Sequence, residues 1–163
     1  MASEDDQVPS LYEWLGGAEV LEGLMLKFYQ RVSADDLLRP LFGEMAADHP
    51  RHVAEFVGEV AGGHADYTAN RGGHANMLAH HFGRNISEAQ RRRWVNLLLD
   101  SADEVGLPAD PEFRSALVAY LEWGSRLAVM NSKLPPGTVT DPSTPMPKWG
   151  WGVPGGPYLP EKK

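Results

Sequence analysis

The stretch that decides the fold class is EVLEGLMLKFYQRV, residues 19–32. Its apolar side chains recur every three or four positions: Val20, Leu21, Leu24, Met25, Phe28, Tyr29 and Val32. Because an α-helix makes one turn every 3.6 residues, this spacing places them on one face of a helix. A strand would instead alternate apolar and polar positions. We therefore predict an amphipathic helix over residues 19–32 with one face in a protein core.

The same helical spacing covers most of the chain up to residue 131. A short turn is expected at residues 35–38. Residues 62–73 are expected to form a loop, because glycine pairs flank them and no apolar period runs through them. No segment has a convincing strand pattern, so the sequence predicts an all-α fold. Further helices are predicted over residues 10–15, 49–61, 74–82, 87–105 and 110–130.

Cap residues mark where three of these helices begin. Ser10 with Glu13, and Ser87 with Gln90, have the spacing of a capping box, in which side chains satisfy backbone N–H groups at a helix start. Asp110 is followed by proline, the order expected for an N-cap and the first helical position. The three positions support helices that begin close to residues 10, 87 and 110.

The composition suits one acidic domain. The chain has 163 residues, 15 Lys and Arg against 22 Asp and Glu, and no cysteine. Without cysteine there is no disulfide, thiolate metal site, iron–sulfur cluster or thioether-linked cofactor. The acidic balance argues against a nucleic-acid or anionic-membrane partner. No apolar run suits a signal peptide or membrane span, so we expect a cytoplasmic protein.

Composition also divides the chain into three parts. Residues 1–9 form a polar extension and residues 10–131 the folded domain. Residues 132–163 hold 8 of the 13 prolines and 5 of the 17 glycines, which prevents a long helix there. Trp149 and Trp151 in this tail leave two alternatives. Either the end is disordered, or it folds back on the domain and buries its indoles.

All six histidines lie between positions 49 and 81. His81 shares an apolar stripe with Met77 and Leu78, whereas His80 is rotated by about 100° towards solvent. Such a histidine is either a core residue or a metal ligand. Zinc is a weak hypothesis, because converging ligands such as His-Glu-x-x-His are lacking. One histidine among Val, Phe, Leu and Met side chains instead suits haem, which brings four nitrogens of its own.

Several motifs follow one another along residues 11–130 in an order that is typical of one family. They are Leu11-Tyr12-Glu13-Trp14-Leu15-Gly16-Gly17, Phe28-Tyr29, Leu41-Phe42, Gly62-Gly63, Gly73-His74, His80-His81, Ile86-Ser87 and Arg91-Arg92-Arg93-Trp94. Together they resemble the group II truncated haemoglobins. The resemblance implies a truncated globin fold, a two-over-two sandwich of four main helices around a non-covalently held haem b.

The resemblance also implies roles for individual residues. His81 matches the ligand of the haem iron, and Tyr29 and Trp94 match hydrogen-bond donors on the gas-binding side. His49 falls on the variable distal position, where it would be a third donor or a sixth ligand. The loop before it varies in length among relatives, so His52 stays an alternative. The remaining haem contacts are implied at Phe42, Val53, Phe56, Val57, Met77, Leu78 and Ile86, with Tyr67 and Arg84 near the propionates.

Each assignment has a simpler alternative. Tyr29 and Trp94 lie on apolar stripes and could be ordinary core residues. A buried phenol or indole needs a hydrogen-bond partner, however, and a bound gas provides one. The run Arg91–Arg93 is most simply a solvated helix face, with pairing to acidic neighbours as the alternative.

The function that the resemblance implies is binding of O2 and other diatomic gases such as CO and NO, as in an oxygen carrier. The alternative is a redox enzyme that uses the same haem for NO dioxygenation or peroxide reduction. That enzyme would need a separate reductase, because the chain has no flavin or nicotinamide domain. A haem-free helical interaction domain is a third hypothesis, and a homodimer stays open.

Overall fold

The computed structural model describes residues 8–43 and 45–152, and within them it contains helices and no strand. The all-α prediction is therefore confirmed, and the expected helices occur within a few residues of their predicted bounds. In chain order the helices are α1 (Leu11–Leu15), α2 (Ala18–Ala34), the 3-10 helix η2 (Arg39–Leu41), α3 (His49–Val60), α4 (Asp66–Arg71), α5 (Gly73–Ala79), α6 (Glu88–Glu104) and α7 (Pro111–Ser132).

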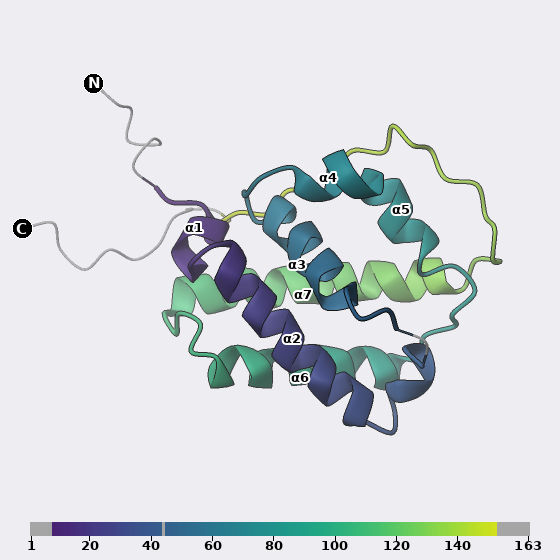
Figure 1. The fold of residues 1–163 in the computed structure, drawn as a ribbon, viewed down its shortest axis with the longest axis horizontal. Coiled ribbons are helices and arrows are strands. Elements are labelled where there is room, and N and C mark those ends of the chain that lie inside the picture. Colours follow the sequence, from purple (N-terminus) through teal and green to yellow (C-terminus); the bar gives the residue numbers. More distant parts are fainter. Residues whose placement is uncertain (1–7, 44, 153–163) are drawn as a thin grey trace, which may run out of the picture.

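The four longest helices form two layers of two (Figure 1). Helix α2 packs against α3 in one layer and α6 packs against α7 in the other, while α2 also contacts α6 across the layers. The inner face of α2 supplies much of the core, and Phe28 and Val32 are completely buried there. This is the face that the apolar spacing predicts. None of the described helices combines the length and the apolar character that a bilayer span requires.

The prediction of a loop over residues 62–73 is wrong in part, because it contains α4. This helix has only six residues and one buried side chain, Tyr67, so no apolar period marks it. Its first turn is capped from another helix: the Glu59 carboxylate on α3 accepts hydrogen bonds from the backbone N–H of Thr68, at 2.9 Å, and from its hydroxyl. Glu59 lies nine residues before Thr68, outside the spacing of a local capping motif, so this cap was not recognised from the sequence.

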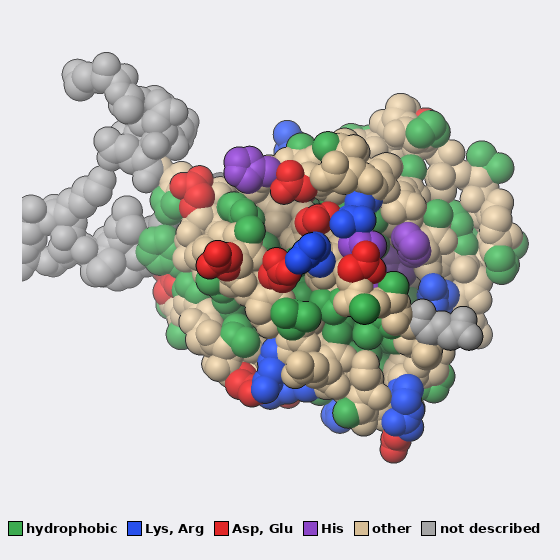
Figure 2. Space-filling model, viewed as in Figure 1, with side chains coloured by type: hydrophobic (Ala, Val, Ile, Leu, Met, Phe, Trp, Pro, Cys, Tyr) green, Lys and Arg blue, Asp and Glu red, His purple; other side chains and the backbone are tan. Residues whose placement is uncertain are grey.

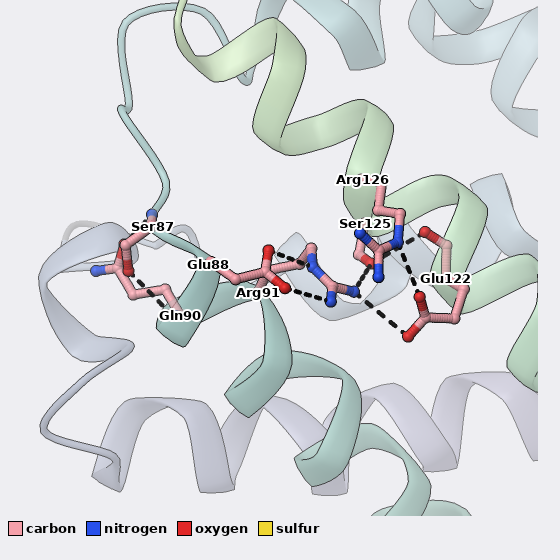
Figure 3. Close-up of polar contacts among 7 residues, drawn as sticks. All are labelled: Ser87, Glu88, Gln90, Arg91, Glu122, Ser125 and Arg126. Carbon is pink, nitrogen blue, oxygen red and sulfur yellow. Dashed lines mark hydrogen bonds and ion pairs between the residues drawn. The ribbon is translucent and has the colours of Figure 1, made fainter.

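The start of α6 combines the predicted capping box with an unexpected buried arginine (Figure 3). The Arg91 side chain is nearly inaccessible to solvent. Its guanidinium donates to both carboxylate oxygens of Glu88, at 2.7 and 2.9 Å, and to the Ser125 hydroxyl on α7 at 3.1 Å. The simplest interpretation of Arg91 as a solvated residue is therefore wrong, and the alternative of acidic pairing is right. Its partners on α7 could not be read from the spacing on α6.

Replacing Arg91 with alanine is expected to lower the free energy of unfolding by about 2 kcal/mol, because charge-assisted hydrogen bonds and buried packing between α6 and α7 are lost. Urea denaturation measures the change. Arg92, which is exposed, provides the matched control. Equal, small effects of Arg91→Ala and Arg92→Ala would show that the contact between α6 and α7 adds little.

The described part of the tail, up to residue 152, folds back on the domain (Figure 1). It leaves α7 beside the loop between α5 and α6, where the Gly83 N–H donates to the Leu134 carbonyl at 2.7 Å. Gly83 has a φ of +77°, and a Cβ there would lie 2.4 Å from the Pro136 ring. Further on, the Trp149 indole donates to the Ala116 carbonyl on α7, and the Trp151 indole donates to the Pro9 carbonyl just before α1. Of the two alternatives for the tryptophans, the structure has the folded-back one.

Candidate functional site

A large cavity of about 860 Å³ lies between the two layers of helices. Side chains of α2, α3, α5, α6 and α7 line it, and most of them are apolar. Its volume falls in the upper part of the range for pockets that hold small molecules or cofactors. The cavity is therefore the candidate site. On the face of the molecule shown in Figure 2, acidic and basic side chains are interspersed rather than gathered into a basic patch.

His81 lines this cavity just beyond the end of α5. The helix ends at Ala79, three residues earlier than predicted, and the His81 N–H closes a tighter turn onto the Leu78 carbonyl at 3.0 Å. Burial and, to a smaller extent, the positive charge of Arg84 together lower the pKa of His81 to about 4. The imidazole is therefore neutral at physiological pH, which is the form that binds a metal ion.

Tyr29, on α2, is almost fully buried and also lines the cavity. Its ring packs edge-on against His49, with 4.8 Å between ring centroids, and against Phe42 at 5.7 Å. Burial raises the pKa of the Tyr29 phenol, and a hydrogen bond with the Trp94 side chain opposes this shift. The phenol therefore keeps its proton at physiological pH and is able to donate a hydrogen bond.

Trp94 reaches the same region from α6. Its indole packs edge-on against Phe28 at 5.2 Å, and Phe28 in turn contacts Tyr29 at 4.8 Å. Trp94 also lines the cavity. An indole N–H and a phenol O–H, contributed by helices of different layers, thus border one apolar space. Both are donors that need partners when buried.

Both His49 and His52 line the cavity, with different neighbours. His49 begins α3 and packs edge-on against Tyr29, whereas the His52 Nε2 atom lies 3.0 Å from the Asp48 carboxylate. Burial lowers the pKa of His49 to about 4, with smaller contributions from neighbouring positive charge. The Nε2 atom of His49 and the Nδ1 atom of His81 are buried and have no hydrogen-bond partner among the described residues. A molecule in the cavity could satisfy such groups, whose burial is otherwise unfavourable.

The nine other residues that the resemblance placed around a cofactor also line the cavity. Two of them are polar. Tyr67 accepts a hydrogen bond from the Asn76 amide at 3.1 Å, and the Arg84 guanidinium donates to the Leu41 carbonyl at 3.0 Å. The nine are Phe42, Val53, Phe56, Val57, Tyr67, Met77, Leu78, Arg84 and Ile86.

Sequence reasoning missed some residues of the cavity wall. Tyr120 and Trp123 on α7 line it, as does Trp149 of the tail. Burial raises the pKa of Tyr120. The helical period places Tyr120 on the inner face of α7, and this signal could have identified it. No local pattern places Trp149 there, because its neighbours in the cavity lie far away in the sequence. No group of three or more His, Cys, Asp or Glu side chains suited to a metal ion occurs within the described part of the chain.

The protein with nothing bound in its cavity is expected to lose stability as pH decreases from about 6.5 to about 4. The unfolded chain takes up protons at His49 and His81 below their ordinary pKa of 6.5, but the folded protein takes them up only near pH 4. Between about pH 6.5 and pH 4 the unfolded state therefore binds more protons than the folded state, and the free energy of unfolding decreases as the pH falls. Urea denaturation at several pH values measures the effect. Replacing both histidines with glutamine should flatten the dependence, and an unchanged slope would contradict the assignment.

Comparisons with known proteins agree on one family. The family described as bacterial-like globin matches residues 10–123. The group 2 truncated haemoglobin YjbI of Bacillus subtilis (strain 168) is 32% identical over 110 residues, which are 68% of this chain and 81% of that protein.

Solved structures show the same likeness. A thermostable haemoglobin from Thermobifida fusca has a TM-score of 0.66 and 30% identity, and the match covers 74% of this chain and 97% of that one. A truncated oxygen-avid haemoglobin from Bacillus subtilis has the same TM-score and identity, with 74% and 99% covered. The chain therefore belongs to the bacterial-like globins and, among them, to the group II truncated haemoglobins, which are haem proteins that bind small diatomic ligands.

Proposed function

We propose that this protein binds O2, and other diatomic gases such as CO and NO, reversibly at a non-covalently held haem b, with His81 as the iron ligand. The observation that carries the proposal is the gathering of Tyr29, Trp94 and His49 around the same apolar cavity that a neutral His81 lines. Because the chain has no cysteine, the haem is held without thioether bonds.

The residues of the cavity fit a haem group. Flat apolar surface is matched by Val, Phe, Leu and Met side chains, and Arg84 and Tyr67 contribute polar groups to the cavity wall that could meet the propionates. His81 and His49 provide buried nitrogen atoms without partners in the described residues. When bound, haem would supply an iron atom at which a diatomic gas can bind, and O2 would be a stronger hydrogen-bond acceptor there than CO. The neutral imidazole of His81 would hold that iron.

Tyr29 and Trp94 then determine which gas is held longest. A hydrogen bond to a charged acceptor in a dry pocket is worth about 1.5–3 kcal/mol. Since about 1.4 kcal/mol corresponds to a factor of ten, two such bonds would slow O2 release roughly a hundredfold or more if they add. CO gains less from the same donors. Slow O2 release is in keeping with the likeness to the oxygen-avid haemoglobin of Bacillus subtilis, and it suits a scavenger, sensor or redox protein better than a bulk carrier.

Absorption spectroscopy of the purified protein tests the proposal. After expression with ample haem we expect a Soret band that shifts when the reduced protein is exposed to O2 and shifts again under CO. Stopped-flow replacement of O2 by CO gives the O2 dissociation rate. A protein that takes up no haem, or haem that binds neither gas, would overturn the proposal and favour the haem-free helical domain.

A further inference from the structure

The C-terminal tail lies beyond the part of the chain that the family model matches. That match ends at residue 123, inside α7, and the solved relatives named above cover 74% of this chain, although others cover up to 83%. The described part of the tail nevertheless lies on the domain. In Figure 1 its yellow trace leaves α7, passes α5 and α4, and returns between α3 and α1. The tail therefore adds contacts beyond those made within the matched region.

Trp149 joins the two layers of helices. Its backbone N–H donates to the Val60 carbonyl at the end of α3, at 2.8 Å. Its indole N–H donates to the Ala116 carbonyl on α7, at 3.1 Å. The ring packs against Trp123 and Tyr120, with centroids 5.6 and 5.8 Å away. Trp149 is thus bonded to α3 through its backbone and to α7 through its indole, and it lines the cavity.

Trp151, two residues later, holds the tail in a different place. Its indole N–H donates to the Pro9 carbonyl at 2.7 Å, and its ring packs edge-on against Trp14 at 5.8 Å. Trp14 in turn donates to the Asp110 carboxylate at the start of α7. The ring of Trp151 is outside the cavity wall. The tail therefore has two indole anchors of similar size, of which Trp149 alone borders the cavity.

The bond from Trp149 to Val60, the last residue of α3, shows which end of the cavity Trp149 borders. The cavity wall includes both His49 at the first residue of α3 and Val60 at its last. Eleven residues of helix span about 16 Å, at 1.5 Å per residue. His49 lies with Tyr29 at one end, and Trp149 is bonded to Val60 at the other. Trp149 is partly exposed to solvent and also lines the cavity, so it lies between the two at the Val60 end of α3.

We propose that Trp149 closes this far end of the haem pocket, so that the tail limits the entry of small apolar molecules and gases by that route. The inference rests on the proposed function for its ligand. Closure depends on the bulk of the indole more than on its N–H group, because the ring fills the opening between the two layers. Trp151 secures the tail but does not itself fill the opening. The two tryptophans are therefore expected to behave differently when shortened.

Two measurements on the full chain test the closure. The first is the rate at which the amphipathic dye 1-anilinonaphthalene-8-sulfonate, whose aromatic rings enter apolar cavities, binds the haem-free protein in a stopped-flow experiment. The second is the rate of CO association with the haem-loaded protein after flash photolysis. The variants are Trp149→Phe, Trp149→Leu and Trp149→Ala, with Trp151→Ala as the matched control. Circular dichroism verifies that each variant keeps its helices.

Both rates are expected to rise as the side chain at position 149 shrinks, little for Phe and severalfold for Leu and Ala. Trp151→Ala should change them far less. Rates that do not depend on side-chain size at 149, or equal changes in Trp149→Ala and Trp151→Ala, would overturn the proposal. If Trp149→Ala fails to fold, the comparison of Phe with Leu decides. A chain that takes up no haem contradicts the proposed function alone, because the dye measurement still tests the closure.

Discussion

Replacing His81 with glycine is expected to weaken haem binding by at least about tenfold, the smallest loss typical when even an outer contact of a metal ligand is removed. The bond from the His81 imidazole to the iron would be the strongest contact between this chain and haem. Burial keeps the imidazole neutral and able to bind, with a pKa of about 4. The Soret absorbance after titration with haem measures the affinity. Transfer of haem to an excess of apomyoglobin measures the rate of loss, which should rise accordingly.

Two controls separate loss of the ligand from loss of the fold. Free imidazole added to His81→Gly should enter the space left by the side chain and restore the spectrum. His80→Ala should leave the spectrum unchanged, because His80 is exposed at the end of α5. If His81→Gly keeps the native spectrum while His80→Ala loses it, the ligand is His80. If neither variant changes it, the iron ligand lies elsewhere.

The helices could be predicted from the sequence because their signals are local. The stripe on α2 and the cap at Ser87 each need fewer than twenty neighbouring residues to be recognised. Helix α4 could not be predicted in this way. It is stabilised by Glu59 on α3 and by burial of Tyr67 against Phe56, and both depend on how α4 packs on α3 rather than on a period or a capping motif. The burial of Arg91 could not be predicted for the same reason, because it depends on Ser125 across the interface of α6 and α7.

The residues of the candidate site could also be predicted only where their signal lies on a single helix. Residues on the inner stripes of α2, α3 and α6 face one cavity because each stripe is also the face that packs on its neighbour. A pattern on one helix cannot show which side chains meet across the cavity. The edge-on contact of Tyr29 with His49, rather than with His52, depends on the path of the loop before α3. The position of Trp149 depends on the path of the C-terminal tail, whose sequence has neither a helical nor a strand period.

Tyr29→Phe and Trp94→Leu are each expected to raise the O2 dissociation rate by roughly tenfold to a hundredfold, because each removes one charge-assisted bond of about 1.5–3 kcal/mol. The CO dissociation rate should change less, since CO is the weaker acceptor. The ratio of the two effects distinguishes a lost hydrogen bond from a general loosening of the pocket, which would speed the release of both gases alike. Stopped-flow replacement and flash photolysis supply the rates.

The double variant and a matched control complete the argument. Tyr29 and Trp94 also contact one another, so the increase in the O2 dissociation rate of the double variant should differ from the product of the two single increases. The difference measures the coupling between the two side chains. Tyr120→Phe removes another buried phenol from the same cavity wall, on α7, and should leave O2 release nearly unchanged. If all three single variants release O2 at the rate of the unmodified protein, neither Tyr29 nor Trp94 donates to the gas. The two rings would then be packing residues, and the retention of O2 would depend on His49 or on the apolar wall.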